Sequence, residues 1–431
     1  MLVLNLAFAS SINNSFLLLG RAFRFWLLLE LVIVTWAYFA WRAPRVRLAG
    51  APFAALGGFL VLAFVSVFWS VRTHSTEKRA LAFLALALVG LALAAVADAR
   101  PEAVRRVLEA LVAAAAIVAL LGLYMLWVSH DQAVQSASLQ YPARYRGIGQ
   151  NPNTVPLLLA PALPLALWLW TRARSRAGKA VAVCAALLFD GSIVASGSRG
   201  ALIAALVGAA VWLLTLPRSW RLRLALVAAA AAVFAADVAI TQIPKPVSPS
   251  AVSHRQSGAH RVIRDAELLL PLEDEIGRPG KNAPPIRRTL FGTSGRARAW
   301  DAAVHQVARR PVAGYGFGTE AQVFVDRYYG FDSTVPENSY LGVALQLGIV
   351  GLVAFLVVLA AVVWVAAVAL RRLSGAALAA ARACAAVVAA GLVLGMTQSY
   401  LTSAGNLASP AVWLAALLLP ALAAHTVRQS Q

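Results

Sequence analysis

The chain has little charge for its length and almost no cysteine. Only 13% of its 431 residues are charged, against about 25% in a typical soluble domain, whereas 60% are hydrophobic. The two cysteines, Cys184 and Cys384, fall inside apolar runs, so the sequence has no disulfide framework and both are predicted to be packing residues. The six histidines are scattered without metal-ligand spacing. We therefore expect no metal and no cofactor.

The sequence also lacks the apolar–polar alternation of β-strands. Its apolar runs are continuous and roughly 17–25 residues long, the length that a helix needs to cross a bilayer. We therefore expect an all-α polytopic membrane protein with about twelve transmembrane helices. The expected spans are residues 2–19, 25–41, 51–71, 80–97, 104–128, 153–171, 180–197, 200–216, 222–241, 347–370, 378–400 and 408–425.

The distribution of basic residues predicts the topology. They are about twice as frequent in the short loops of one side as in those of the other, which places the N-terminus in the cytoplasm. The chain then divides into spans one to nine (1–241), one large periplasmic loop (242–346) and spans ten to twelve (347–431). Because this bias accounts for much of the net charge of +20, the charge does not indicate nucleic-acid binding.

Three charged residues around the large loop stand out. Arg199 lies in a very tight outer turn between two expected spans, where a cation is costly unless it faces a polar cavity or a partner. Arg296 lies late in the loop, and Glu337 directly precedes the return to the membrane. Each also has a structural interpretation: Arg199 could snorkel or pair with Asp190, Arg296 could be a solvated charge, and Glu337 could be a favourable first-turn acid of a helix.

A basic pocket above a membrane suits an anionic lipid head group such as a pyrophosphate. Arginine forks bind phosphate oxygens in pairs and stabilise the negative charge that grows on a leaving group, and a carboxylate can act as general base toward an acceptor hydroxyl. We therefore expect Arg199, Arg296 and Glu337 to be the catalytic set. Residues 296–309 are expected to form an amphipathic helix with Trp300, Val304 and Val307 on one face. The predicted substrate-binding residues of second rank are Arg144, Arg146, Arg298, Trp300 and Asn338.

Five segments together resemble the O-antigen ligase and polymerase family of bacterial envelope glycan enzymes. Each is weak alone, but their order and spacing around one large outer loop are fairly specific. The match is good over roughly residues 145–365. The segments are Phe68-Trp-Ser70; Gly149-Gln-Asn-Pro-Asn153; Ser196-Gly-Ser-Arg-Gly200; Arg296-Ala-Arg-Ala-Trp300 with Pro311-Val-Ala-Gly-Tyr-Gly316; and Asn338-Ser-Tyr-Leu341 with Leu347-Gly-Ile-Val-Gly-Leu352.

The resemblance implies a metal-independent glycosyltransferase of the bacterial inner membrane. Such enzymes move a glycan from undecaprenyl pyrophosphate onto an acceptor hydroxyl at the periplasmic face. The ligases use lipid A–core as acceptor, and the polymerases use another lipid-linked repeat unit. Arg199 and Arg296 match arginines that the family uses for the pyrophosphate. Many ligases have histidine where this chain has Glu337, which leaves a polymerase as the alternative within the family.

Two alternatives come from other classes. A transporter of lipid-linked glycans would carry its site near the bilayer midplane, often at broken helices in paired repeats. The expected spans of this chain contain few ionisable residues, chiefly Glu30, Asp190 and Asp237, and the sequence shows no internal repeat. A scaffold without activity would tolerate the loss of Arg199 or Arg296. The concentration of polar residues at one face favours an enzyme.

Overall fold

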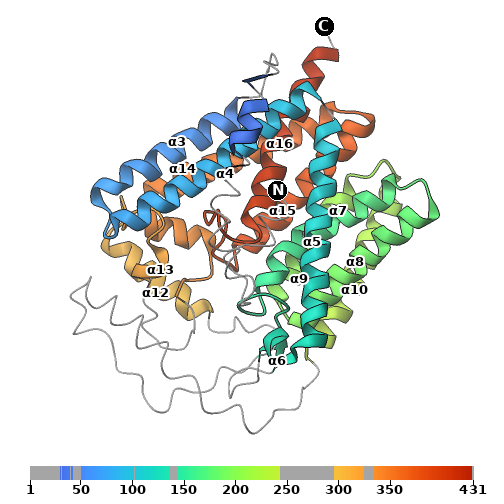
Figure 1. Ribbon diagram of the computed structural model, residues 1–431, viewed down its shortest axis with the longest axis horizontal. Coiled ribbons are helices and arrows are strands. Elements are labelled where there is room, and N and C mark those ends of the chain that lie inside the picture. Colours follow the sequence, from blue (N-terminus) through green and yellow to red (C-terminus); the bar gives the residue numbers. More distant parts are fainter. Residues whose placement is uncertain are drawn as a thin grey trace.

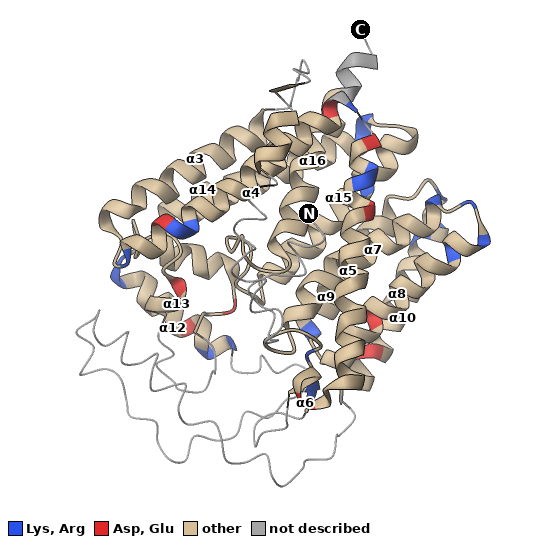
Figure 2. Ribbon diagram, viewed as in Figure 1, with Lys and Arg blue, Asp and Glu red and all other residues tan. Residues whose placement is uncertain are grey.

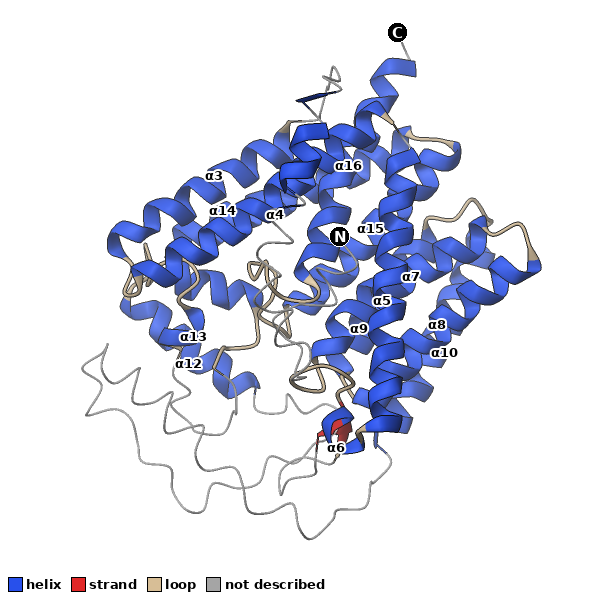
Figure 3. Ribbon diagram, in the orientation of Figure 1, coloured by secondary structure: helices blue, strands red, loops and turns tan. Residues whose placement is uncertain are grey.

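Most of the described chain is helical (Figure 3). The computed structural model describes residues 30, 32–38, 40–41, 50–100, 102–135, 143–242, 296–324 and 334–429. Within these ranges the single pair of strands joins β1 (Val134–Gln135) to β2 (Arg144–Tyr145), next to the one-turn helix α6 (His130–Ala133). The described part is therefore an all-α structure with one two-residue strand pairing.

The helices follow the apolar runs of the sequence. Their bounds are α3 (Ala51–Val65), the 3₁₀ helix η1 (Ser66–Trp69), α4 (Thr73–Ala99), α5 (Glu102–Val128), α7 (Thr154–Arg172), α8 (Arg176–Ser196), α9 (Arg199–Leu214), α10 (Trp220–Gln242), α12 (Arg296–Arg309), α13 (Glu320–Val323), α14 (Ser339–Arg372), α15 (Gly375–Gly395) and α16 (Ser409–Gln429).

Eight helices in the described ranges are long and apolar enough to cross a membrane, and α9 and α16 are shorter apolar helices. Ten of the expected spans thus coincide with a helix. The span expected at 2–19 lies outside the described residues, and the one at 25–41 is helical at 32–38. The protein is a multi-pass helical membrane protein, whereas the count of twelve spans stays a prediction. Figure 2 shows most charged residues at helix ends or in connecting turns.

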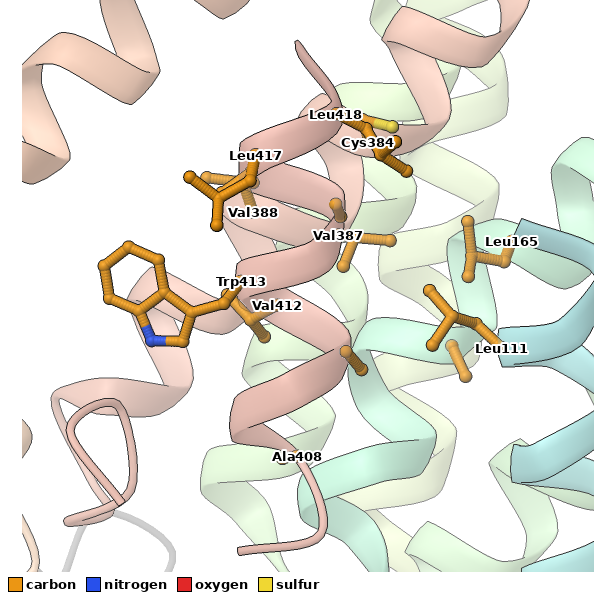
Figure 4. Close-up of a cluster of buried hydrophobic side chains, with 14 of the residues drawn as sticks. Leu111, Leu165, Cys384, Val387, Val388, Ala408, Val412, Trp413, Leu417 and Leu418 are labelled. Carbon is orange, nitrogen blue, oxygen red and sulfur yellow. The ribbon is translucent and has the colours of Figure 1, made fainter. Parts of the chain in front are cut away.

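The helices pack in two groups (Figure 1). One contains α3, α4, α14 and α16, and the other contains α5, α7, α8, α9 and α10. Helix α15 joins them, because it packs against α7 and α9 on one side and α14 and α16 on the other. Figure 4 shows this junction, where Trp413 and Leu417 of α16 lie beside Val388 of α15. Cys384 is buried here as predicted, but the packing prediction was wrong for Cys184, which is exposed on α8.

Two breaks in the helices matter for the site. Gly348 has φ 65° and ψ −163°, so α14 is a short helix followed by a long one. Only glycine adopts this conformation without strain, and a side chain there would overlap the main chain at Val312. The second break is the end of α15 at Gly395, five residues before the end of the expected span, so that residues 396–408 form turns. Of the predicted large loop, residues 243–295 and 325–333 lie outside the described residues.

Candidate functional site

The tight turn between α8 and α9 places Arg199 at the start of a helix. Gly197 closes α8 in the left-handed conformation, with φ 63°, and Ser198 precedes α9 in an extended conformation. A side chain at Gly200 would overlap Thr397, so the first turn of α9 lies against the turn that follows α15. The N–H groups of this first turn point toward the start of the helix and add positive potential beside Arg199.

Arg296 begins α12 and forms an ion pair with Glu337. Its Nη2 donates to Oε2 of Glu337 at 2.6 Å, and both side chains are largely shielded from solvent. The Nε of Arg296 is buried and has no hydrogen-bond partner within the described part of the chain. A buried donor without an acceptor is costly. Arg296 therefore keeps a donor that a ligand oxygen can satisfy.

Glu337 has the one positive φ angle, 47°, among the described residues other than glycine. This left-handed conformation is strained for a residue with a long side chain. It is held by its surroundings: Gln398 Nε2 donates to Glu337 Oε2 at 3.3 Å, and Asn338 caps the following helix. Such strain is found disproportionately at functional sites.

The charges of the site do not cancel. Arg199 and Arg296 are close enough to repel each other electrostatically, and Glu337 is the acidic partner of Arg296. Two guanidinium groups and one carboxylate leave one net positive charge at the end of α9. The three predicted catalytic residues, which are far apart in the sequence, thus converge in space. Asp190 has Asp237 of α10 as a charged neighbour.

Arg144 and Arg146, both predicted to bind substrate, hold main-chain oxygens. Arg144 donates from Nε to the Ser196 carbonyl at 2.6 Å and from Nη2 to Oδ1 of Asn153 at 3.0 Å. Arg146 donates from Nε to the Gln132 carbonyl at 2.7 Å and from Nη2 to the Asp131 carbonyl at 3.0 Å. These bonds fasten the outer turns beside the site, and a substrate contact stays a prediction.

The other predicted substrate-binding residues lie on α12 and at the start of α14. Arg298 is exposed, and Trp300 is partly buried with an indole N–H that has no partner in the described ranges. Asn338 Oδ1 accepts from the N–H groups of Tyr340 at 3.0 Å and Leu341 at 3.1 Å, which makes it the N-cap of α14. Their contacts with substrate stay predictions.

The expected helix at 296–309 is confirmed, and of its predicted face Trp300 and Val307 are partly buried but Val304 is not. The face that packs inward contains Ala299, Ala302, Ala303 and Gln306, whereas Val304 is 52% exposed. The small alanine side chains allow α12 to approach α14 closely. A face of alanines is not recognised when an amphipathic helix is identified by its large apolar residues. This close approach brings Arg296 to Glu337.

The glycine-rich turn after α12 fastens the site to the membrane helices. The Trp69 indole donates to the Ala313 carbonyl at 2.9 Å, and the Val71 N–H donates to the Tyr315 carbonyl at 3.0 Å. Gly316, with φ 106°, lies so close to Ser70 that a side chain would overlap it. Two of the recognised sequence segments, 68–70 and 311–316, therefore contact each other.

Three polar residues of this region were not predicted from the sequence to belong to the site. Gln398 and Ser399 were assigned to an expected span because apolar residues surround them, although α15 ends before them. Glu320 resembled an ordinary loop acid, but Oε1 of its carboxyl is enclosed by the protein. The polar pair Gln398–Ser399 at the end of an apolar run is the sequence feature that could have indicated that the helix ends before it. Among the described residues, no group of three or more His, Cys, Asp or Glu side chains has a geometry that could hold a metal ion.

Comparison with known sequences agrees with this geometry. Residues 180–356 match the family model described as O-antigen ligase. The matched segment contains Arg199, Arg296 and Glu337. No curated protein sequence gives a significant match. The matched segment covers less than half of the chain, and it supports a relation to the O-antigen ligase and polymerase family, whose members are glycosyltransferase-like enzymes that act on lipid-linked glycans.

Proposed function

We propose that the protein transfers a glycan from undecaprenyl pyrophosphate to the hydroxyl group of a glycan acceptor at the periplasmic face of the bacterial inner membrane. The observation that carries the proposal is the convergence of Arg199, Arg296 and Glu337. The family match supports the reaction class, and the acceptor favoured here is lipid A–core.

The proposed step is a direct displacement at the anomeric carbon. The acceptor oxygen forms the new bond to this carbon while its proton passes to the Glu337 carboxylate. The bond from the carbon to the pyrophosphate oxygen breaks, and that oxygen keeps the electron pair. Arg199, Arg296 and the N–H groups at the start of α9 stabilise the growing negative charge. The configuration at the carbon is inverted, and no metal takes part.

The ion pair between Arg296 and Glu337 gives the site a way to respond to the donor. A pyrophosphate carries more negative charge than one carboxylate and competes for the Arg296 guanidinium. When Arg296 turns part of its hydrogen bonding to the pyrophosphate, the Glu337 oxygen that it held is released to accept a hydrogen bond from the acceptor hydroxyl. Donor binding thereby prepares the base for the acceptor.

A polymerase of the same family is the second candidate. The observation that favours it is Glu337, which occupies the position where many ligases have histidine. In that case the acceptor is a second lipid-linked repeat unit, and the roles of Arg199 and Arg296 are unchanged.

The test uses purified protein in liposomes with a polyprenyl-pyrophosphate oligosaccharide donor, with and without lipid A–core, in the presence of a metal chelator. Glycan on lipid A–core, formed only when this acceptor is present, supports the ligase. A ladder of lengthened donor without added acceptor supports the polymerase. Movement of donor across the bilayer without transfer would overturn both and favour a transporter.

A further inference from the structure

A second acidic residue, Glu320, lies behind the candidate site. It is the first residue of α13, and its Oε2 accepts a hydrogen bond from Gln346 Nε2 of α14 at 3.2 Å. Its Oε1 is enclosed, and a side chain at Gly342 would overlap the carboxyl group. Helix α14 thus leaves a space that this carboxyl fills.

Burial raises the pKa of Glu320 to about 7, while a hydrogen bond with Ser399 and the positive charge of Arg79 act in the opposite direction. Arg79 on α4 is the charged group that faces Glu320. Its guanidinium Nη1 donates to Ser403 Oγ at 3.3 Å, and its stem packs against Gly318. A buried carboxyl with so few compensating partners is costly to the fold. A position that only fills space would be occupied more cheaply by an apolar side chain.

The contacts of Ser399 connect this carboxyl to the candidate site. Ser399 Oγ accepts a hydrogen bond from the main-chain N–H of Asn338 at 3.0 Å, and its hydroxyl lies close enough to the Glu320 carboxyl to lower the pKa of that group. Asn338 directly follows the strained Glu337, and Gln398, which donates to Glu337, directly precedes Ser399. Ser399 therefore fastens the residue that follows Glu337 and is the chain neighbour of the residue whose amide donates to the Glu337 carboxylate.

We propose that Glu320 is a positioning residue of the site: through Ser399 it fixes the left-handed turn at Glu337 and the amide of Gln398 that contacts it. This inference rests on the proposed function. Glu320 does not itself touch the reacting groups. It keeps Glu337 in the one conformation that meets both Arg296 and the acceptor hydroxyl.

The experiment measures kcat and the KM for donor in the liposome assay for wild type, Glu320→Ala, Glu320→Gln, Ser399→Ala and the Glu320→Ala/Ser399→Ala double variant. Ser192→Ala, at a buried serine of α8 away from this region, is the matched control. Both single alanine variants should lower kcat by about 10- to 100-fold with a donor KM within about twofold of wild type, the size of effect seen when a supporting group is removed.

The double variant should be no slower than the worse single variant, because both changes remove one connected unit. Glu320→Gln should keep kcat within about threefold, since its amide oxygen still accepts from Ser399. Thermal unfolding in detergent shows whether the variants are folded, and the Gln variant remains informative if the Ala variant is not.

Wild-type kcat in Glu320→Ala and Ser399→Ala, or additive losses in the double variant, would overturn the positioning role while the proposed function stands. A tenfold or larger loss in Glu320→Gln would also overturn it, because it would assign the effect to the charge. A wild-type protein that transfers no glycan is a separate result, since it removes the proposed function and the positioning role with it.

Discussion

Glu337 shows at the scale of one residue how the fold stores strain at the site. A left-handed conformation costs a side-chain-bearing residue about 1–2 kcal/mol. Hydrogen bonds from Arg296 and Gln398 to Oε2 of Glu337, together with the Asn338 cap that fixes the next residue at the start of α14, offset that cost. Since these partners come from distant segments, Glu337 adopts this conformation only when α12, α14 and the turn after α15 are assembled.

Loss of either arginine should abolish most of the transfer activity. Removing one preorganised group that stabilises a growing negative charge typically costs about 100- to 1,000-fold in kcat. We expect a loss of this size for Arg199→Ala and Arg296→Ala in the liposome assay. Arg296→Lys should recover little, because a lysine cannot bind a carboxylate and a phosphate through a fork. Arg309→Ala, at the exposed end of the same helix, is the matched control, and equal losses there would point to general damage to α12.

Replacement of Glu337 tests the base directly. Glu337→Gln keeps the size of the side chain but cannot accept the acceptor proton, so kcat should fall by about 100-fold or more. Glu337→His should retain more activity than Gln, because a neutral imidazole can take the proton. Its activity should decline below about pH 6.5 as the imidazole becomes protonated. Equal activity of wild type and Glu337→Gln would remove Glu337 from the role of base.

Glu320 should make the stability of the protein depend on pH. Its pKa is about 7 in the folded protein against an ordinary value of 4.5, so the folded state binds more protons between these values. Stability should therefore fall as the pH rises from about 4.5 to 7, by on the order of 3 kcal/mol in total. Glu320→Gln should remove this component and raise the unfolding temperature above that of wild type at pH 8. Parallel pH curves for the two proteins would contradict the assignment.

At the scale of elements, the close fit between the glycine-rich turn and α14 decides where α12 lies. Tyr315 and Gly316 donate main-chain hydrogen bonds to the carbonyls of Leu345 and Gln346 at 3.2 and 2.8 Å. The break at Gly348 allows the Ile349 N–H to donate to the Pro311 carbonyl at 2.7 Å. The turn therefore continues the hydrogen bonding of α14 where the helix is interrupted, and it fixes the end of α12 beside the start of the membrane helix.

Two glycines allow this fit to be tested. Gly348 and Gly375 both have left-handed φ angles, 65° and 56°, but a side chain at Gly348 would overlap Val312 whereas nothing lies near Gly375. Gly375→Ala should cost only the conformational strain, about 1 kcal/mol. Gly348→Ala should cost clearly more and lower the unfolding temperature further, with loss of transfer activity. Equal shifts in detergent-solubilised protein would show that the turn is not held against α14.

The sequence allowed some elements to be predicted well and others poorly, for physical reasons. The bounds of α12 follow from a local signal, an amphipathic period. The end of α15 does not follow from a local signal. The apolar run continues past it into turns whose residues, such as Tyr400 and Leu401, are buried by other helices. Arg199 and Arg296 were recognisable by type and position, but the contacts of Ser399 depend on tertiary packing, which no local pattern encodes.

At the scale of the whole molecule, the site is built where segments far apart in the chain meet. The turn at 196–200, the start of α12, the residue before α14 and the turn after α15 each supply one side chain. In Figure 1, α12 and α13 lie at the end of the bundle away from the C-terminal end of α16. A site at one end of a helical bundle is placed for a substrate whose lipid tail lies in the bilayer and whose head group lies at its surface.

The side of the membrane on which this end lies is the last prediction. The distribution of basic residues places α12 in the periplasm and the turn between α7 and α8 in the cytoplasm. In a Cys184→Ala/Cys384→Ala background, a membrane-impermeant maleimide should label Arg298→Cys in cells whose outer membrane is permeabilised. It should label Arg174→Cys only after the inner membrane is broken. Both positions are exposed, so accessibility alone favours neither. The reverse pattern would place the two arginines and Glu337 on the cytoplasmic side, where a periplasmic transfer reaction cannot use them.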